Sequence, residues 1–225
     1  MKAYLTASWN TRWKRRSNVV NVGILGDVSV GKTTILRLFV KYVEDKTLQK
    51  KFKTGEASIV KADFSGEATL PSKDDMKETK TIHPNRVVFR IADKMHTLFA
   101  PGGDDRPLVR MGITTVSRIA RLIVAVFDVS RDIDDQFEFY SAVRFIPRTI
   151  IVALNKADLL GADMNKKIEA YKKKIGDYFS TRRQIKVEGF YVTVAESKEE
   201  FQDQNDECAR LILDCIKNES AEKAG

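Results

Sequence analysis

The feature that most constrains this chain is a glycine-rich loop set between an apolar run and a helical pattern. The loop reads Gly-Asp-Val-Ser-Val-Gly-Lys-Thr at residues 26–33. Residues 19–25 have the apolar character of a buried strand, and apolar residues recur at helical spacing through 35–40. The loop fits the pattern G-x-x-x-x-G-K-[ST], whose glycines let backbone N–H groups surround a phosphate at a helix N-terminus. A strand, this loop and a helix in sequence predict an α/β domain that binds a nucleoside triphosphate.

Each residue type of this phosphate loop has a chemical role in such a site. Lys32 is expected to reach the β- and γ-phosphates, and the hydroxyl of Thr33 to ligate Mg²⁺. The backbone N–H groups of the loop supply the other contacts. The predicted nucleotide-binding residues of the loop are Gly26, Asp27, Val28, Ser29, Val30, Gly31, Lys32, Thr33 and Thr34.

The composition is that of a folded domain with a basic surface. The chain has 225 residues and a formal net charge of +8, which suits nucleic acid, a membrane surface or an acidic protein. Cys208 and Cys215 fall on the apolar face of a predicted helix, so we expect buried free thiols. No apolar stretch approaches the length of a membrane span, and the N-terminus lacks the apolar core of a signal peptide. These features predict a soluble cytoplasmic protein.

Residues 1–17 form a basic extension ahead of the predicted domain. The extension contains no acidic residue, and in a helix Trp9 and Trp13 would share one face beside the basic cluster. This pattern suits peripheral contact with an anionic membrane or an acidic partner. It equally suits an extension whose indoles pack on the domain. Its basic residues are Lys2, Arg12, Lys14, Arg15 and Arg16.

Downstream of the phosphate loop, strand and helix patterns alternate. Strands are predicted at 86–91, 96–99, 122–128, 149–154 and 187–194, and helices at 108–120, 134–145 and 165–179. A capping-box pattern at Ser197 and Glu200 predicts the start of a last helix. Because a short turn joins 86–91 to 96–99, that pair must be antiparallel. Together these elements predict a doubly wound, mostly parallel six-stranded sheet with one antiparallel strand and helices on both faces.

Residues 46–80 interrupt this alternation. The stretch is rich in Lys, Ser, Thr, Gly and Asp, with a short alternating piece at 57–63 that could form a strand. We interpret it as an insertion rather than a core element. The predicted organisation is therefore a basic extension (1–17), a nucleotide-binding domain (18–218) with an insertion at about 46–80, and a flexible C-terminal tail (219–225).

A second motif, Asn155-Lys156-Ala157-Asp158, directly follows the predicted strand at 149–154. The Asp158 carboxylate can accept from both the ring N1–H and the exocyclic amine of guanine, a donor pair that adenine lacks. Asn155 would brace the loop, and the stem of Lys156 would lie along the base. The motif predicts guanine as the base and disfavours an adenine-specific NTPase or kinase.

Taken together, these motifs resemble the Ras-like small GTPase superfamily. The phosphate loop is followed by a Thr-Ile pair before a hairpin, a Pro-Gly loop, Asn-Lys-Ala-Asp, and Thr-Val-Ala at 193–195. The resemblance runs from about residue 18 to 218 and leaves 1–17 and 46–80 unmatched. It implies a small GTPase domain that binds GTP and GDP with Mg²⁺, in which the backbone of Val194 and Ala195 approaches the guanine carbonyl oxygen.

The same resemblance implies two switch loops. Thr81 would be the switch I threonine that binds Mg²⁺ together with Thr33 and senses the γ-phosphate, with Thr79 as an alternative for that role. Gly102 would donate its N–H to the γ-phosphate as switch II begins. Hydrolysis would release both loops, and effectors would bind one of the two states.

The chain departs from this superfamily at switch II. The usual motif is Asp-x-x-Gly followed by Gln, where the Asp holds the Mg²⁺ water shell and the Gln orients the attacking water. This chain has Phe-Ala-Pro-Gly-Gly at 99–103, and Val28 stands where a glycine commonly favours hydrolysis. Metal binding would rest on Thr33, Thr81, phosphate oxygens and water, with help from Asp104 or Asp105. We expect slow hydrolysis that needs a partner or an internal arginine.

The internal arginines nearest to switch II are Arg106 and Arg110, which could equally be solvated charges. A Pro-Gly loop without the aspartate resembles the corresponding loop of the MglA-like branch of these GTPases, which is found in archaea and bacteria. That branch has Gln where Gly103 stands. The resemblance implies a polarity or motility switch with a regulatory partner of the roadblock-domain type.

Three functions stay open on the sequence. The first is a GTP/GDP switch with slow hydrolysis. The second is a protein that holds guanine nucleotide as a structural ligand, which the missing switch II Asp and Gln favour. The third is a ribosome- or RNA-associated GTPase, suggested by the basic extension and a lysine-rich predicted helix. No RNA-binding motif with stacking aromatics is visible, so nucleic acid is the less favoured partner.

Overall fold

The structure is a computed structural model that describes residues 20–70, 78–81 and 83–222. The predicted basic extension lies outside the described residues. The predicted tail begins inside the last helix, which continues to Glu222, so the boundary at 218 is corrected by four residues.

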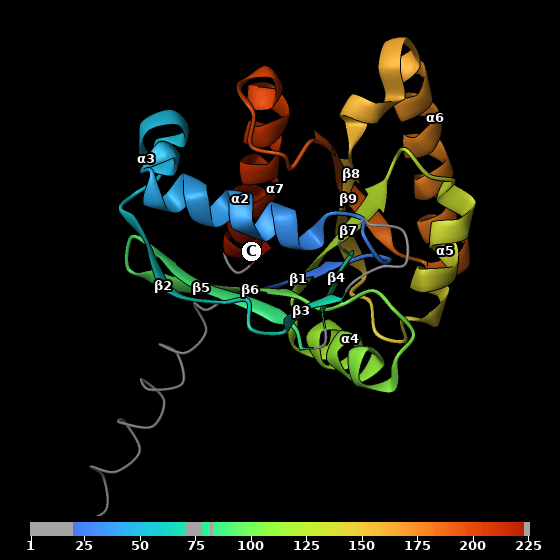
Figure 1. The fold of residues 1–225 in the computed structure, drawn as a ribbon, viewed down its shortest axis with the longest axis horizontal. Helices are drawn as coiled ribbons and strands as arrows, with labels where there is room; N and C mark the ends of the chain where they lie inside the picture. Colours follow the sequence, from blue (N-terminus) through green and yellow to red (C-terminus); the bar gives the residue numbers. More distant parts are fainter. Residues whose placement is uncertain (1–19, 71–77, 82, 223–225) are drawn as a thin grey trace, which may run out of the picture.

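A central sheet organises the described part of the chain, where seven strands pair in the order β2-β5-β6-β1-β7-β8-β9 (Figure 1). β5 runs antiparallel to β2 and β6, whereas β1 is parallel to β6 and β7, and β8 is parallel to β7 and β9. The predicted doubly wound, mostly parallel α/β fold is confirmed. The strands are β1 (Val20–Leu25), β2 (Ala57–Asp63), β5 (Asn85–Ile91), β6 (Lys94–Ala100), β7 (Leu122–Asp128), β8 (Thr149–Asn155) and β9 (Lys186–Thr193).

The seventh strand comes from the stretch interpreted as an insertion. β2 pairs with β5 along its length, with a bulge between Ile59 and Lys61. Its polar sequence suits an edge strand that is largely exposed, which is why its alternation is weak. The interpretation of 46–80 as lying outside the core sheet is therefore wrong for residues 57–63.

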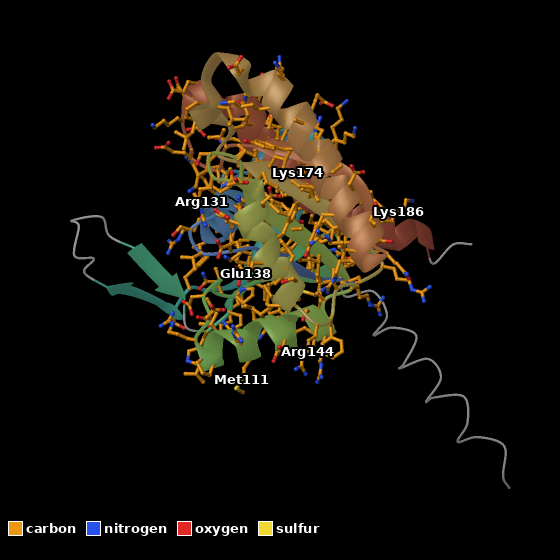
Figure 2. All side chains as sticks on the ribbon, turned by 90° about the vertical axis from the view of Figure 1, so that its right-hand side faces the viewer. Met111, Arg131, Glu138, Arg144, Lys174 and Lys186 are labelled. Carbon is orange, nitrogen blue, oxygen red and sulfur yellow. The ribbon has the colours of Figure 1, made fainter. Side chains whose placement is uncertain are left out.

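The rest of that stretch builds on the domain without joining the central sheet. Helix α3 (Thr47–Phe52) follows the phosphate-loop helix. β3 (Glu67–Leu70) and β4 (Glu78–Thr81) pair with each other in a separate antiparallel ribbon. Figure 2 shows this ribbon, drawn in teal, projecting away from the body of the molecule.

Helices cover both faces of the sheet, as predicted (Figure 1). α2 (Lys32–Glu44) and α7 (Gln202–Glu222) pack on one face. α4 (Pro107–Ile119), α5 (Ile133–Ala142) and α6 (Met164–Asp177) pack on the other. Alternate residues of the buried strands feed the two apolar layers, so that Ile24 of β1 faces α2 and α7 while Leu25 joins the opposite layer.

Two local expectations meet different outcomes. Cys208 and Cys215 are buried free thiols, as predicted. The predicted capping box is wrong, because α7 begins at Gln202 after a 3-10 turn at Glu199–Phe201. The Ser197 hydroxyl instead accepts a hydrogen bond from Lys41 Nζ at 2.8 Å. In the part of the chain that the structure describes, no helix combines the length and apolarity needed to cross a membrane.

Candidate nucleotide-binding site

The phosphate loop joins β1 to α2 at the carboxyl edge of the sheet. β1 lies between β6 and β7, and the chain crosses from the β6 side to the β7 side around it. Doubly wound sheets bind ligands at this kind of topological switch point, just outside the carboxyl ends of the strands. The fold therefore places the loop where a nucleotide is expected.

Gly31 gives the loop its shape. It has φ of 95°, a left-handed conformation that favours glycine, and a Cβ there would overlap Nδ2 of Asn155. That amide nitrogen donates to the carbonyl of Val30 at 2.9 Å, and Asn155 Oδ1 accepts from the Thr193 hydroxyl at 3.1 Å. The first residue of the Asn-Lys-Ala-Asp motif thus ties the phosphate loop to the ends of β8 and β9.

Lys32 is buried against the phosphate loop. Its Nζ donates to the carbonyls of Gly26 at 2.8 Å and Asp27 at 2.6 Å. Burial lowers the pKa of Lys32 to about 8, and the charges of Asp27 and Asp104 oppose that shift. The ammonium is therefore held against two carbonyls of the phosphate loop, and added negative charge beside it would stabilise its charged form.

Thr33 contacts a residue that the sequence analysis did not single out. Its Oγ1 accepts a hydrogen bond from Nδ2 of Asn85 at 3.0 Å, and Asn85 is completely buried at the start of β5. Thr81, the predicted switch I threonine, ends β4, where its backbone is in register with Glu67. The side chains of Thr79 and Thr81 lie outside the described part, so their role stays a prediction.

The predicted switch II segment packs directly on the phosphate loop. Gly102 is buried, and a Cβ on Gly103 would lie 2.5 Å from the nitrogen of Val28 and closer still to the carbonyl carbon of Asp27. Only glycine allows this approach of two backbones. Gly103, which replaces the expected Gln, is therefore a packing residue of the loop.

The two candidate arginines are held by neighbouring acids. Arg106 Nε and Nη2 donate to the two carboxylate oxygens of Asp104 at 2.9 and 2.6 Å. Arg110 Nη2 donates to Asp105 at 2.7 Å. The charge of Asp104 partly opposes the lowering of the Lys32 pKa, which places the Arg106–Asp104 pair near the phosphate loop.

Arg131 contacts the phosphate loop and was missed. It follows β7, and its Nη2 donates to Asp27 Oδ2 at 2.8 Å while its Nη1 donates to the carbonyl of Val28 at 3.0 Å. Figure 2 labels it beside α5. A lone arginine in a loop after a strand leaves no sequence signal for such a contact.

The predicted base-binding residues lie next to each other at the ends of β8 and β9, where Asn155 is in register with Thr193. Lys156 donates from Nζ to Asp128 Oδ2 at 2.6 Å, and Asp158 is exposed. This placement leaves the Asp158 carboxylate accessible to a ligand.

Val194 and Ala195 are buried at the start of the next loop. Asn205 of α7 donates from Nδ2 to the carbonyl of Val194 at 2.6 Å and to that of Glu196 at 2.9 Å, and so fixes this loop. Asn205 was also missed, although a buried amide on the apolar face of a helix is a readable signal.

Among the described residues, no three His, Cys, Asp or Glu side chains converge as a metal site. The donor set at Thr33, a hydroxyl with an amide beside it at the start of α2, fits Mg²⁺, a hard cation that keeps several waters and takes phosphate oxygens as ligands.

A phosphate loop at the switch point, tied through Asn155 to the loop that carries Asp158, defines a P-loop nucleotide-binding protein. The elongation factor Tu GTP binding domain family matches residues 17–220 of the chain. The chain belongs to this family.

Several solved structures share the fold. Translation elongation factor SelB from Methanococcus maripaludis, in complex with the GTP analogue GppNHp, is 21% identical with a TM-score of 0.56, and covers 88% of this chain and 34% of its own. The bacterial selenocysteine-specific elongation factor EF-Sec is 12% identical with a TM-score of 0.52, covering 87% and 29%. The GTP-bound S. cerevisiae Ski7 GTPase-like domain is 16% identical with a TM-score of 0.51, covering 81% and 44%.

The chain thus spans about a third of the length of each of the two elongation factors. No curated protein matches it. The comparisons place the chain among P-loop GTPases and give the MglA-like branch no support.

Proposed function

We propose that this chain is a GTP/GDP-dependent switch that binds guanine nucleotide with Mg²⁺ and hydrolyses GTP slowly. One observation carries the proposal: the amide of Asn155 bonds the carbonyl of Val30 at 2.9 Å, which joins the base loop to the phosphate loop in one site. One loop would then contact the phosphates of a bound nucleotide, and the other loop would contact its base.

Each end of that nucleotide has its own residues. At the base, the Asp158 carboxylate accepts from the N1–H and amine of guanine, and the backbone at Val194 and Ala195 faces its carbonyl oxygen. At the phosphates, the loop N–H groups and Lys32 supply positive charge. Thr33 and Thr81 would hold Mg²⁺, which neutralises charge on the β- and γ-phosphates when it is bound.

Slow hydrolysis follows from what replaces the usual switch II residues. Gly103 has no side chain to orient a water, and Arg106 must leave Asp104 before it can stabilise a transition state. The predicted contacts of Thr81 and Gly102 with the γ-phosphate would order the two switch loops in the GTP state only. A regulatory partner that supplies a cation or displaces Asp104 would accelerate the reaction.

The family favours a second candidate, a GTPase that works with RNA or the ribosome. Two of the solved structures of similar fold are elongation factors by their titles, and this chain carries a net charge of +8. Binding to ribosomes or RNA that weakens steeply with salt in the GTP state would support this candidate.

The test is single-turnover hydrolysis of GTP with Mg²⁺, read beside limited proteolysis of the GDP-bound and GTP-bound protein. We expect guanine nucleotide in the purified protein, slow turnover, and fewer cleavages between residues 64 and 106 with a non-hydrolysable GTP analogue. Guanine binding without turnover, and with the same cleavage pattern for both nucleotides, would contradict the switch and favour a structural ligand.

A further inference from the structure

The aspartate that usually holds the Mg²⁺ water shell has no counterpart on β6. Its position is occupied by Phe99, which packs in the apolar layer against α4, α5 and α6. The guanidinium of Arg86 lies 5.8 Å from the centre of the Phe99 ring. A phenyl ring offers no acceptor, so position 99 cannot orient the Thr33 hydroxyl.

The register of β5 and β6 brings such a group to the site. Because the two strands are antiparallel, the start of β5 lies beside the end of β6, and Asn85 is in register with Ala100 while Arg86 is in register with Phe99. Asn85 therefore shares the α2 face of the sheet with Ala100, whereas Phe99 packs on the opposite face. Asn85 is completely buried, and its amide reaches the hydroxyl of Thr33 at 3.0 Å across a sequence separation of 52 residues.

We propose that Asn85 is the positioning residue for Mg²⁺ binding by Thr33, in place of the missing switch II aspartate. The inference rests on the proposed function, because it assumes a guanine nucleotide and its metal in this site. It assigns to a strand ahead of switch II the task that the usual switch II motif gives to its aspartate.

An amide can serve the hydroxyl in both metal states. With no metal bound, the Thr33 oxygen accepts from Nδ2 of Asn85, as observed. When that oxygen gives a lone pair to Mg²⁺, the nearby cation disfavours an N–H donor facing the hydroxyl, and the hydroxyl proton needs an acceptor. Because the two ends of a carboxamide have nearly the same size, a half turn of the buried amide would present Oδ1 to that proton. A carboxylate could only accept.

The neutral amide also sets the strength of metal binding. An aspartate at this position would add a full negative charge beside a divalent cation in a buried setting, where the interaction is poorly screened. The amide orients Thr33 without that charge. The site should therefore bind Mg²⁺ more weakly than the same site with a carboxylate, which makes the nucleotide easier to exchange.

The experiment measures release of a fluorescent GDP analogue from the full chain as free Mg²⁺ is varied, with EDTA as the metal-free limit. Wild type is compared with Asn85→Asp and Asn85→Ala. We expect the Mg²⁺ concentration that half-slows release to fall roughly tenfold in Asn85→Asp and to rise roughly tenfold in Asn85→Ala. In EDTA, Asn85→Ala should release the analogue at about the wild-type rate, and Asn85→Asp at least as fast, because its carboxylate then faces the phosphates with no cation between them.

A second readout does not depend on release. The buried carboxylate of Asn85→Asp should lower the melting temperature of the GDP-bound protein in EDTA, and Mg²⁺ should raise that temperature by more than it does in wild type.

Asn205→Ala is the matched control for the release experiment, since it also removes a buried amide at the nucleotide site. It should speed release equally with and without Mg²⁺ and leave the Mg²⁺ midpoint unchanged.

The proposal is overturned if the Mg²⁺ midpoint is the same in wild type and both Asn85 variants, or if each variant changes the release rate by the same factor and in the same direction in EDTA as in Mg²⁺. The latter result would show that Asn85 only packs. Failure of wild type to bind the analogue at all would instead contradict the proposed function.

Discussion

The pKa of Lys32 is unusually low because the phosphate loop buries its ammonium group. Its pKa of about 8 lies below the ordinary lysine value, since burial disfavours the charged form. Phosphates placed beside it favour the charged form, so they must raise this pKa. Above pH 8, binding of nucleotide is therefore coupled to protonation of Lys32.

The coupling predicts proton uptake that depends on pH. Calorimetric titration of GTP at pH 9, in two buffers of different ionisation enthalpy, should give an uptake approaching one proton per nucleotide. At pH 7 the lysine is already about nine-tenths charged, so Lys32 should take up only about a tenth of a proton. An uptake at pH 9 no larger than at pH 7 would contradict the proposed role of Lys32.

Residues that belong to a contiguous sequence motif could be predicted from the sequence. Residues that contact the site from a distant segment of the chain could not. The phosphate loop and the Asn-Lys-Ala-Asp motif are placed together, as their spacing after buried strands suggested. Asn85 and Arg131 contact the loop across 52 and about 100 residues of sequence. Their contacts depend on strand register and loop path, which local patterns do not encode.

At the scale of elements, the switch II segment and the phosphate loop share a backbone contact at Gly103. Replacing Gly103 with alanine would force a Cβ into the backbone of Asp27 and Val28, and the loop would have to shift. We expect Gly103→Ala to weaken GTP binding at least tenfold, measured by fluorescence titration. The loop shift should change the melting temperature only modestly, because the apolar layers are not touched.

Gly176→Ala in α6 is the control for that substitution. A Cβ at residue 176 meets no atom within 4 Å, so the change should leave nucleotide affinity unchanged. It should stabilise the protein by about 0.5–1 kcal/mol, because alanine is the better helix former. Equal nucleotide affinity in the Gly103 and Gly176 variants would contradict the close packing of switch II on the loop.

Apolar periodicity predicted the buried elements closely and the edge of the sheet poorly. The strand expected at 122–128 is observed at Leu122–Asp128, and the helix expected at 108–120 at Pro107–Ile119. The alternating piece at 57–63 predicted only a possible strand of an insertion, because an exposed edge strand lacks the apolar residues that mark a core strand. The capping-box pattern failed because the Ser197 hydroxyl bonds Lys41 of α2, a contact between distant elements.

At the scale of the whole molecule, every described nucleotide-site residue lies between Gly26 and Asn205, inside the proposed domain. A chain shortened to residues 18–222, which keeps all of α7, should bind GTP and GDP within twofold of the full chain. The role of the basic extension is read from two further measurements on the same pair. Surface contact predicts that only the full chain binds vesicles containing phosphatidylserine.

Packing of the extension on the domain predicts a lower melting temperature for the shortened chain and no vesicle binding by either protein. A loss of nucleotide affinity on shortening would contradict the proposed domain boundary at residue 18.

The measurement that tests the central claim most directly is the affinity for GTP beside ATP, with Mg²⁺, in wild type and in Asp158→Ala. Removing a carboxylate that accepts two hydrogen bonds from guanine should weaken GTP binding roughly a hundredfold or more and leave ATP binding unchanged. Wild type should strongly prefer GTP. Equal affinity of wild type for the two nucleotides, or a GTP affinity that survives the substitution, would contradict guanine recognition by Asp158 and the switch built on it.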